Sequence, residues 1–193
     1  PYSRVEDMVR TVEAAAGEPA TPIELVEDFE RWVSGQDATH LAWLEAQRFK
    51  GKPGQSCALP GPNGIAKIVV GFDPDAPTWS CASVPAKLPP GRYALASETS
   101  SANLAALALG WGLGQYEFVR YKPGRDDDAE RRILEIGDAP TVDTVRNMLR
   151  GIGLARDLIN TPACDMMPQN LADEVAALAA DHGAEWTEVV GDA

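Results

Sequence analysis

The chain has 193 residues, of which 45% are hydrophobic and 24% are charged, a composition typical of ordinary globular proteins. Its formal net charge of -12 repels phosphate backbones and anionic lipid, so nucleic acid is not an expected partner. No apolar run approaches the roughly 20 residues of a membrane-spanning helix, and no secretory signal is visible, so no membrane partner is expected.

The first predicted element is a short N-terminal segment. Val5, Met8, Val9 and Val12 have the spacing of one face of a helix. We therefore expect residues 1–21 to form an N-terminal helix or an ordered tail that precedes the first domain.

Residues 22–140 are predicted to form an α/β domain. Ile65–Phe72 is the clearest strand, because its nearly continuous apolar run indicates burial on both faces of a sheet. Residues 60–64 combine proline, glycine and Asn-Gly and predict a hairpin turn. Further strands are predicted at Pro22–Val26, Ser56–Leu59, Tyr93–Ala96, Glu117–Tyr121 and Arg132–Ile136. Helices are predicted at Glu27–Val33, Ala38–Phe49 and Ser100–Tyr116, with one helical turn at Ser83–Lys87 in a stretch otherwise rich in loops.

A long helix is predicted from Thr141 to Asn160, with Thr141 as its N-terminal cap and Pro162 ending it. Gly151 and Gly153 lie inside this helix, where each costs about 1 kcal/mol relative to alanine. We therefore expect a packing reason for these glycines, and we expect residues 141–162 to link two domains.

Residues 163–193 have the pattern of a second domain that is not completed. Pro168 suits the first turn of a helix, and Gly183 suits its C-terminal cap. Trp186–Val190 is predicted to be a strand, so the segment forms half of a βαβ crossover. A parallel strand needs neighbouring strands, and few residues remain to supply them, so we expect a truncated domain.

Few side chains have the spacing of a catalytic or metal-binding motif. His40 and His182 lie at the ends of predicted helices, where surface or capping roles explain them. Residues 126–128, three aspartates flanked by arginines, are expected to form a solvated loop rather than a cation site. The sequence GWGLG at residues 110–114 lacks the lysine of a P-loop and is expected to end a helix against the sheet.

The three cysteines, Cys57, Cys81 and Cys164, are far apart and include no CxxC pair. This pattern is typical of a reducing compartment, so we expect a cytoplasmic protein without disulfides. None has a histidine nearby in the sequence to activate it, so buried or inert thiols are expected. The sequence therefore assigns no catalytic, metal-binding or cofactor-binding residue in this chain.

Residues 155–168, ARDLINTPACDMMP, resemble the join between the two domains of the leucyl aminopeptidase family, the M17 metallopeptidases. Earlier pieces of the chain resemble a bacterial branch of that family in the same order: TPIELV, HLAWLEAQRFKGKPGQSCALPGPNG, KIVVGF, LPPGRYAL and AALALGWGLGQYEFVRY. The resemblance covers roughly residues 22–190.

The resemblance implies a hydrolase that removes N-terminal residues from peptides with two divalent metal ions, zinc or manganese, in a hexamer. The family's metal-binding NTDAEGR motif is absent from this chain. Asn160-Thr161-Pro162 begins like that motif, but Pro162 stands in place of its first acid, so the segment cannot substitute for it. The resemblance therefore implies the N-terminal region of a leucyl-type aminopeptidase, without a metal site and inactive alone. The alternative is a non-catalytic ancillary domain that binds a ligand or partner or assists oligomer assembly.

The predicted fold class is therefore α/β. It comprises a small mixed-sheet N-terminal domain flanked by helices at residues 22–140, a long linker helix at 141–162, and the first helix and strand of a truncated catalytic domain at 163–193.

Overall fold

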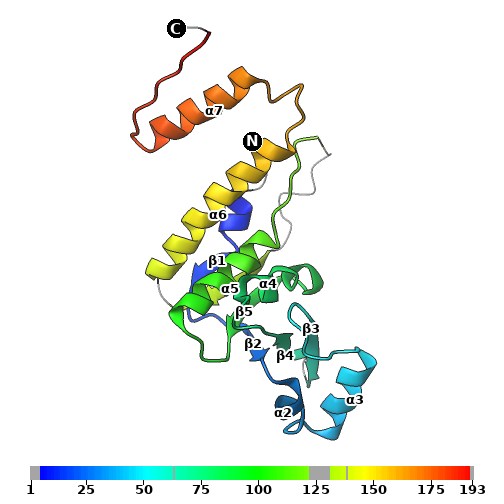
Figure 1. Cartoon of the computed structure of the whole chain (residues 1–193). Helices are drawn as coiled ribbons and strands as arrows, with labels where there is room; N and C mark the ends of the chain where they lie inside the picture. Colours follow the sequence, from blue (N-terminus) through cyan, green and yellow to red (C-terminus); the bar gives the residue numbers. More distant parts are fainter. Residues whose placement is uncertain (1–4, 63, 122–130, 138, 192–193) are drawn as a thin grey trace. The chain divides into compact units, whose positions relative to one another are not determined.

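The computed structural model describes residues 5–62, 64–121, 131–137 and 139–191. The chain divides into two compact units, Pro1–Gly153 and Leu154–Ala193. The larger unit is built on a six-stranded sheet with helices on both faces (Figure 1). The predicted α/β class with a mixed sheet is confirmed.

The sheet has the strand order β1-β6-β5-β2-β4-β3. Its neighbouring strands are parallel except for β3 and β4, which pair antiparallel, so the predicted hairpin is confirmed. Asn63 of its turn lies outside the described residues. The strands are β1 (Val12–Ala14), β2 (Thr21–Val26), β3 (Ser56–Gly61), β4 (Gly64–Gly71), β5 (Gly91–Leu95) and β6 (Arg132–Ile136).

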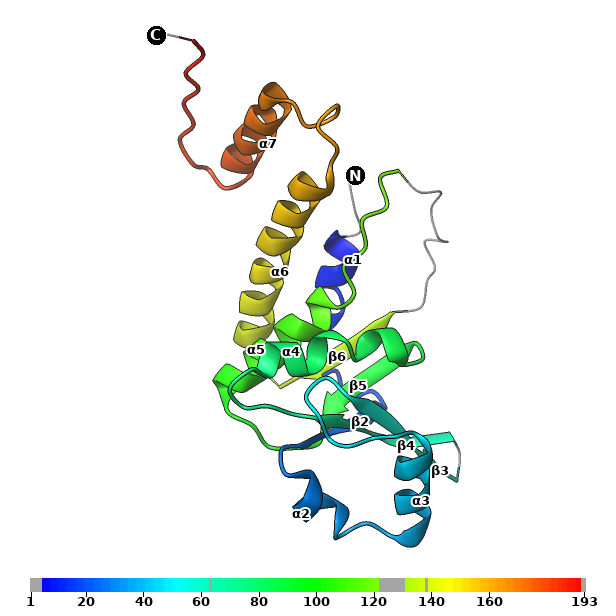
Figure 2. The same cartoon turned by 45° about the vertical axis from the view of Figure 1, so that its right-hand side comes forward.

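Helices cover both faces of the sheet. The helix α5 packs with the short α4 over one face, and α2 and α3 lie against the other (Figure 2). The helical elements of the larger unit are α1 (Val5–Val9), α2 (Phe29–Val33), α3 (Ala38–Ala46), α4 (Pro77–Ala82), the 3-10 turn η1 (Pro85–Lys87), α5 (Ser101–Leu113) and most of α6 (Ala139–Asn160).

The alternation of side chains along β4 produces two hydrophobic cores. Ile68 and Val70 are buried in the cluster that contains Trp111 of α5, whereas Val69 is buried with Leu44 of α3. The prediction that β4 is buried on both faces is therefore confirmed for its second half. Its first residues, 64–66, are exposed.

The glycines of GWGLG allow α5 to approach α4 closely. A Cβ at Gly110 would overlap the backbone carbonyl of Thr78, and one at Gly114 would overlap that of Ala82. The helix ends at Leu113 with Gly114 as its C-cap, so GWGLG ends a helix as predicted. The predicted end at Tyr116 and the predicted packing of these glycines against the sheet are wrong. The glycines are needed because α4 lies against them. The residues that form α4, Pro77–Ala82, were predicted only as loop.

Glycine also has a packing role in α6. A Cβ at Gly153 would contact the side chain of Val5 at 2.8 Å, which is the packing reason that the sequence predicted. A Cβ at Gly151 would meet no atom within 4 Å, so the same prediction is wrong there. α6 begins at Ala139, which places Thr141 inside the first turn and not at the cap. Pro140 fits this start, because proline suits the first helical turn.

Two segments of the larger unit differ from their predicted secondary structure. Val12 does not extend the N-terminal helix, since β1 pairs with β6 there and Val12 lies opposite Leu134. Glu117–Tyr121 was predicted as a strand but is irregular, and it takes no part in the ladders of the described sheet. Local periodicity cannot supply the partner strand that decides both cases.

The smaller unit contains α7 (Pro168–Asp181), which begins and ends as predicted. The side chain of Asn170 accepts a 3.0 Å hydrogen bond from the backbone N–H of Met167, and Gly183 has φ +63 just beyond the C-cap. Trp186–Val190 was predicted as a strand but is irregular and exposed. A strand needs a hydrogen-bonded neighbour, and none pairs with this segment among the described residues.

Candidate functional site: a cleft where β2 and β5 end

The strand order creates a topological switch point between β2 and β5. After β2 the chain runs through α2 and α3 to β3 and β4 on one side, and after β5 it runs through α5 to β6 on the other side. The loops leaving these two adjacent parallel strands therefore diverge at the carboxyl edge of the sheet. In open α/β sheets, ligands bind in the crevice that this divergence leaves.

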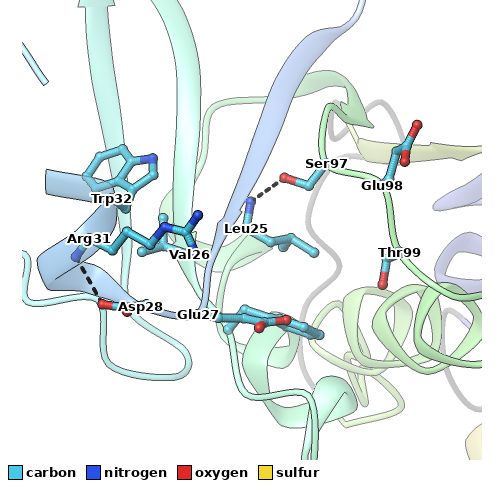
Figure 3. Close-up of a pocket in the computed structure, with 10 residues that line it drawn as sticks. Leu25, Val26, Glu27, Asp28, Arg31, Trp32, Ser97, Glu98 and Thr99 are labelled. Carbon is cyan, nitrogen blue, oxygen red and sulfur yellow. Dashed lines mark hydrogen bonds between the residues drawn. The ribbon is translucent and has the colours of Figure 1, made fainter. Parts of the chain in front are cut away.

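A cleft of about 440 Å³ lies at this position. Arg31 and Trp32 stand on one side of it, Ser97 to Thr99 stand on the other, and Leu25 lies between them (Figure 3). The lining residues are Leu25, Val26, Glu27, Asp28, Arg31, Trp32, Phe72, Ser97, Glu98 and Thr99.

Hydrogen bonds hold the edges of the cleft together. The hydroxyl of Ser97 accepts a 2.9 Å bond from the backbone N–H of Leu25. The backbone N–H of Phe72 donates a 2.9 Å bond to the carbonyl of Val26. The loops after β4 and β5 are thus both fixed to the end of β2, so the cleft is built on the most central part of the sheet.

The indole of Trp32 is held by a polar cluster on the same side. Its Nε1 donates a 2.6 Å hydrogen bond to Oε1 of Glu24, and Nζ of Lys67 donates a 2.6 Å bond to Oε2 of the same carboxylate. Partial burial raises the pKa of Glu24, but the hydrogen bonds from Lys67 and Trp32 and the charge of Lys67 outweigh burial and hold that pKa below its ordinary value.

The cleft carries three carboxylates and one guanidinium. Asp28 caps α2, because its Oδ1 accepts a 3.0 Å hydrogen bond from the backbone N–H of Arg31. Glu27, Glu98 and the guanidinium of Arg31 are exposed, and none of the three forms an ion pair within the described part of the chain. These charges remain available to a ligand.

The histidines lie where the sequence predicted. Nδ1 of His40 is 3.1 Å from Oδ2 of Asp37, the residue that caps α3, and His182 is the C-cap of α7. Residues 126–128 lie outside the described part of the chain.

The cysteines are free thiols. Burial raises the pKa of Cys81 to about 12 and also raises the pKa of Cys57, so neither is a ready nucleophile. Cys164 is exposed. Of the expected buried or inert thiols, Cys57 and Cys81 are thus confirmed as buried, whereas the inertness of Cys164 stays a prediction.

The family resemblance implies a two-metal centre, whose ligands would have to come from clustered donor side chains. Among the described residues, no group of three or more histidine, cysteine, aspartate or glutamate side chains is placed to hold a metal ion. These residues therefore do not fit a two-metal site. Over the same residues, no helix combines the length and the apolar character needed to cross a membrane.

Sequence reasoning missed the cleft. The local signal was the predicted strand at Pro22–Val26 followed directly by Glu27 and Asp28, since polar residues at the carboxyl end of a buried parallel strand often line a site. Recognising the cleft also requires knowing that β5 lies beside β2, a pairing that joins Thr21 to Tyr93 and has no local sequence signature.

Comparison with known proteins assigns the family. The family described as M17 aminopeptidase, N-terminal domain, matches residues 21–133, more than half of the chain. A probable cytosol aminopeptidase of Leifsonia xyli subsp. xyli is 33% identical over 155 residues, covering 72% of this chain and 31% of that protein. A probable cytosol aminopeptidase of Corynebacterium efficiens is 28% identical over 170 residues, covering 81% of this chain and 34% of that protein. The chain thus spans about a third of the length of these relatives.

A solved structure agrees with the assignment. The crystal structure of a cytosol aminopeptidase from Coxiella burnetii superimposes with a TM-score of 0.77 at 27% identity, covering 91% of this chain and 38% of that one. The mixed sheet and its helices therefore have a counterpart in a solved cytosol aminopeptidase. This chain belongs to the M17 aminopeptidase family, and its matching region is that family's N-terminal domain.

Proposed function

We propose that the chain is the N-terminal part of a metal-dependent leucyl-type aminopeptidase, a hydrolase that removes N-terminal residues from peptides. The observation that carries this proposal is the match of residues 21–133 to the N-terminal domain of the M17 aminopeptidases. The names of the relatives from Leifsonia xyli and Corynebacterium efficiens support peptidase activity in the whole protein.

The family resemblance implies a site for two zinc or manganese ions. We propose that this metal site belongs to a second domain and not to residues 1–162. Two observations support this division. The described residues do not fit a two-metal site, and the relatives are about three times as long as the region they share with this chain. In this proposal residues 22–140 are the N-terminal domain, 141–162 the linker and 163–193 the start of the catalytic domain.

We further propose a cytoplasmic enzyme that assembles as a hexamer in its full-length form. The word cytosol in the relatives' names supports the location, and the family resemblance supports the assembly. Light scattering on the full-length enzyme after size exclusion tests the assembly. A mass of six subunits is expected, and a stable monomer with full activity would contradict it.

A chimera tests the main proposal. Residues 1–162 of this chain would replace the corresponding part of the Leifsonia xyli relative, and hydrolysis of leucine p-nitroanilide would be followed with Mn²⁺ or Zn²⁺. The expected result is metal-dependent hydrolysis within about tenfold of the unmodified relative, a difference of about 1.4 kcal/mol in the barrier.

Two further features make the chimera experiment decisive. A second chimera, joined at residue 140, serves as the reserve if the first junction prevents folding, which cooperative thermal unfolding would reveal. A chimera that folds and assembles but shows no metal-dependent hydrolysis would contradict the proposal.

A second candidate function is ligand binding by a non-catalytic ancillary domain. The specific observation in its favour is the cleft between β2 and β5, where Glu27, Glu98 and Arg31 form no ion pair within the described residues. The two functions are compatible, since an enzyme's ancillary domain can carry a separate ligand site.

A further inference from the structure

We propose that the cleft between β2 and β5 binds a small zwitterion with an apolar side chain, the chemical class of the α-amino acids. The first argument is position and size. The cleft lies at the topological switch point of the sheet, where open α/β sheets bind ligands. Its volume of about 440 Å³ falls within the range of about 300–1,000 Å³ typical of small-molecule sites.

The floor of the cleft suits an apolar side chain. Val26 is 1% exposed and Phe72 is 5% exposed, and the partly buried Leu25 lies beside them. Trp32 adds an aromatic wall whose indole nitrogen is already bonded to Glu24, so its ring is fixed and need not be ordered by a ligand. An apolar group that binds here is removed from water, which favours binding. Few protein side chains have to be ordered for this, so the entropic cost of binding is small.

The rim of the cleft suits a molecule with both charges. The guanidinium of Arg31 offers the forked donor geometry that matches a carboxylate. Glu27 and Glu98 offer acceptors for an ammonium group, and Glu98 comes from the wall opposite Arg31 (Figure 3). Since none of these three side chains forms an ion pair within the described residues, a ligand would not have to displace one.

The same charges disfavour a nucleotide, the other common occupant of a switch point. Phosphate sites in such sheets use a glycine-rich turn after the strand, whereas Glu27 and Asp28 follow β2 here. Three carboxylates against one guanidinium, in a chain of net charge -12, repel a polyanion.

This inference stands apart from the proposed peptidase function, because binding is measured on this chain alone without any hydrolysis. Amino acids are also the products of an aminopeptidase. If the proposed function holds, the cleft would let the enzyme's N-terminal domain bind a product of its own reaction, a consequence that rests on that function.

Amide NMR spectra of the ¹⁵N-labelled chain test the inference. L-leucine is expected to cause saturable shifts in the amides of residues 25–32 and 97–99, with a Kd in the millimolar range or tighter. 3-Methylbutylamine and 4-methylpentanoate each keep one charge and are each expected to bind at least about tenfold more weakly than leucine.

Variants identify the charges that bind. Arg31→Ala is expected to weaken leucine binding about tenfold and to abolish the preference for leucine over 3-methylbutylamine. Glu27→Gln is expected to weaken leucine binding and to reduce the preference for leucine over 4-methylpentanoate. Arg10→Ala, which removes an exposed arginine outside the cleft, is the matched control and should leave the Kd unchanged.

Three outcomes would overturn the inference. The first is the absence of saturable shifts with L-leucine, and the second is leucine affinity that is the same in Arg31→Ala and in Arg10→Ala. The third is stronger binding of adenosine monophosphate than of leucine to the same amides. Arg31→Met replaces Arg31→Ala if the spectrum of the alanine variant shows a loss of folding.

Discussion

The hydroxyl oxygen of Ser97 lies 2.9 Å from the backbone nitrogen of Leu25 and accepts its hydrogen bond across 72 positions of sequence. Just before this point, the backbone N–H of Ala96 donates a hydrogen bond to the carbonyl of Ile23. The serine side chain therefore continues the pairing of the two segments beyond the end of β5 and holds one wall of the cleft against its floor.

Removing this hydroxyl is expected to destabilise the larger unit. Ser97→Ala leaves the partly buried N–H of Leu25 without its acceptor, which costs about 1 kcal/mol of unfolding free energy. Ser101→Ala, an exposed position in the first turn of α5, is the matched control and should change stability by less than about 0.5 kcal/mol. Urea unfolding followed by circular dichroism measures both, and equal stabilities for the two variants would refute the role of Ser97.

Two glycine-to-alanine changes within helices should have opposite effects. In Gly110→Ala the new methyl group would overlap the carbonyl of Thr78, so a loss of about 1–3 kcal/mol or more is expected from overpacking against backbone. In Gly151→Ala the methyl group meets no atom within 4 Å, so a gain of about 1 kcal/mol is expected from helix propensity. Thermal and urea unfolding give the sign of each change. A neutral Gly110→Ala variant would show that α4 and α5 do not pack as closely as described.

The ion pairs of Arg92 are expected to stabilise the packing of the neighbouring strands β1, β6 and β5. Nε of Arg92 is 2.6 Å from Oε1 of Glu135, whose side chain is only 6% exposed, and the same guanidinium reaches Glu13 at 2.9 Å. Arg92→Met leaves the Glu135 carboxylate buried without a partner, at an expected cost of about 3 kcal/mol.

The exposed pair between Arg150 and Glu6, at 3.1 Å, supplies the control for Arg92. Arg150→Met should cost less than about 1 kcal/mol, because exposed ion pairs contribute little. The double variant Arg92→Met/Glu135→Leu should recover part of the loss, since it removes the stranded charge as well. Similar costs for Arg92→Met and Arg150→Met in urea unfolding would disprove the role assigned to Arg92.

The lowered pKa of Glu24 predicts how the stability of the folded chain depends on pH. Its pKa in the folded chain lies below the ordinary value of 4.5, so the unfolded chain binds this proton more readily than the folded one. Glu24 therefore contributes stability that is complete above pH 4.5 and is lost as the pH falls through the lower, folded pKa.

Urea unfolding of the wild type and of Glu24→Gln at several pH values between 7 and 3 measures this contribution. The stability difference between the two should shrink as the pH falls below the ordinary pKa of the carboxyl. In the Lys67→Met background the same difference should depend less on pH, because Lys67 supplies a hydrogen bond and a charge to the carboxylate. A difference that stays constant with pH would contradict the assigned role of the pair.

Much of the fold follows from local sequence patterns, and the errors have a common physical cause. The apolar run of β4 and the small-residue helix α5 were predictable because their burial depends on their own residues. β1 was not, because a strand of three residues is defined by its pairing with β6, more than a hundred residues away. Trp186–Val190 shows the converse, since a strand-like pattern stays irregular without a partner.

The candidate site was less predictable than the fold. The lone histidines and the two buried cysteines have the structural roles that the sequence indicated. The cleft depends on Arg31, in the helix that follows β2, and Glu98, in the loop that follows β5, lining a common space (Figure 3). That arrangement arises from strand order, which side-chain spacing along one chain does not encode.

The most direct test of the central claim is an activity assay on the purified 193-residue chain. Hydrolysis of leucine p-nitroanilide would be followed with added Zn²⁺ or Mn²⁺, and the active chimera with the Leifsonia xyli relative would serve as positive control. If the chain is the N-terminal part of an aminopeptidase whose metal site lies in a second domain, it releases no p-nitroaniline above the rate without protein. Metal-dependent turnover by the chain alone, lost on addition of a chelator, would contradict the claim.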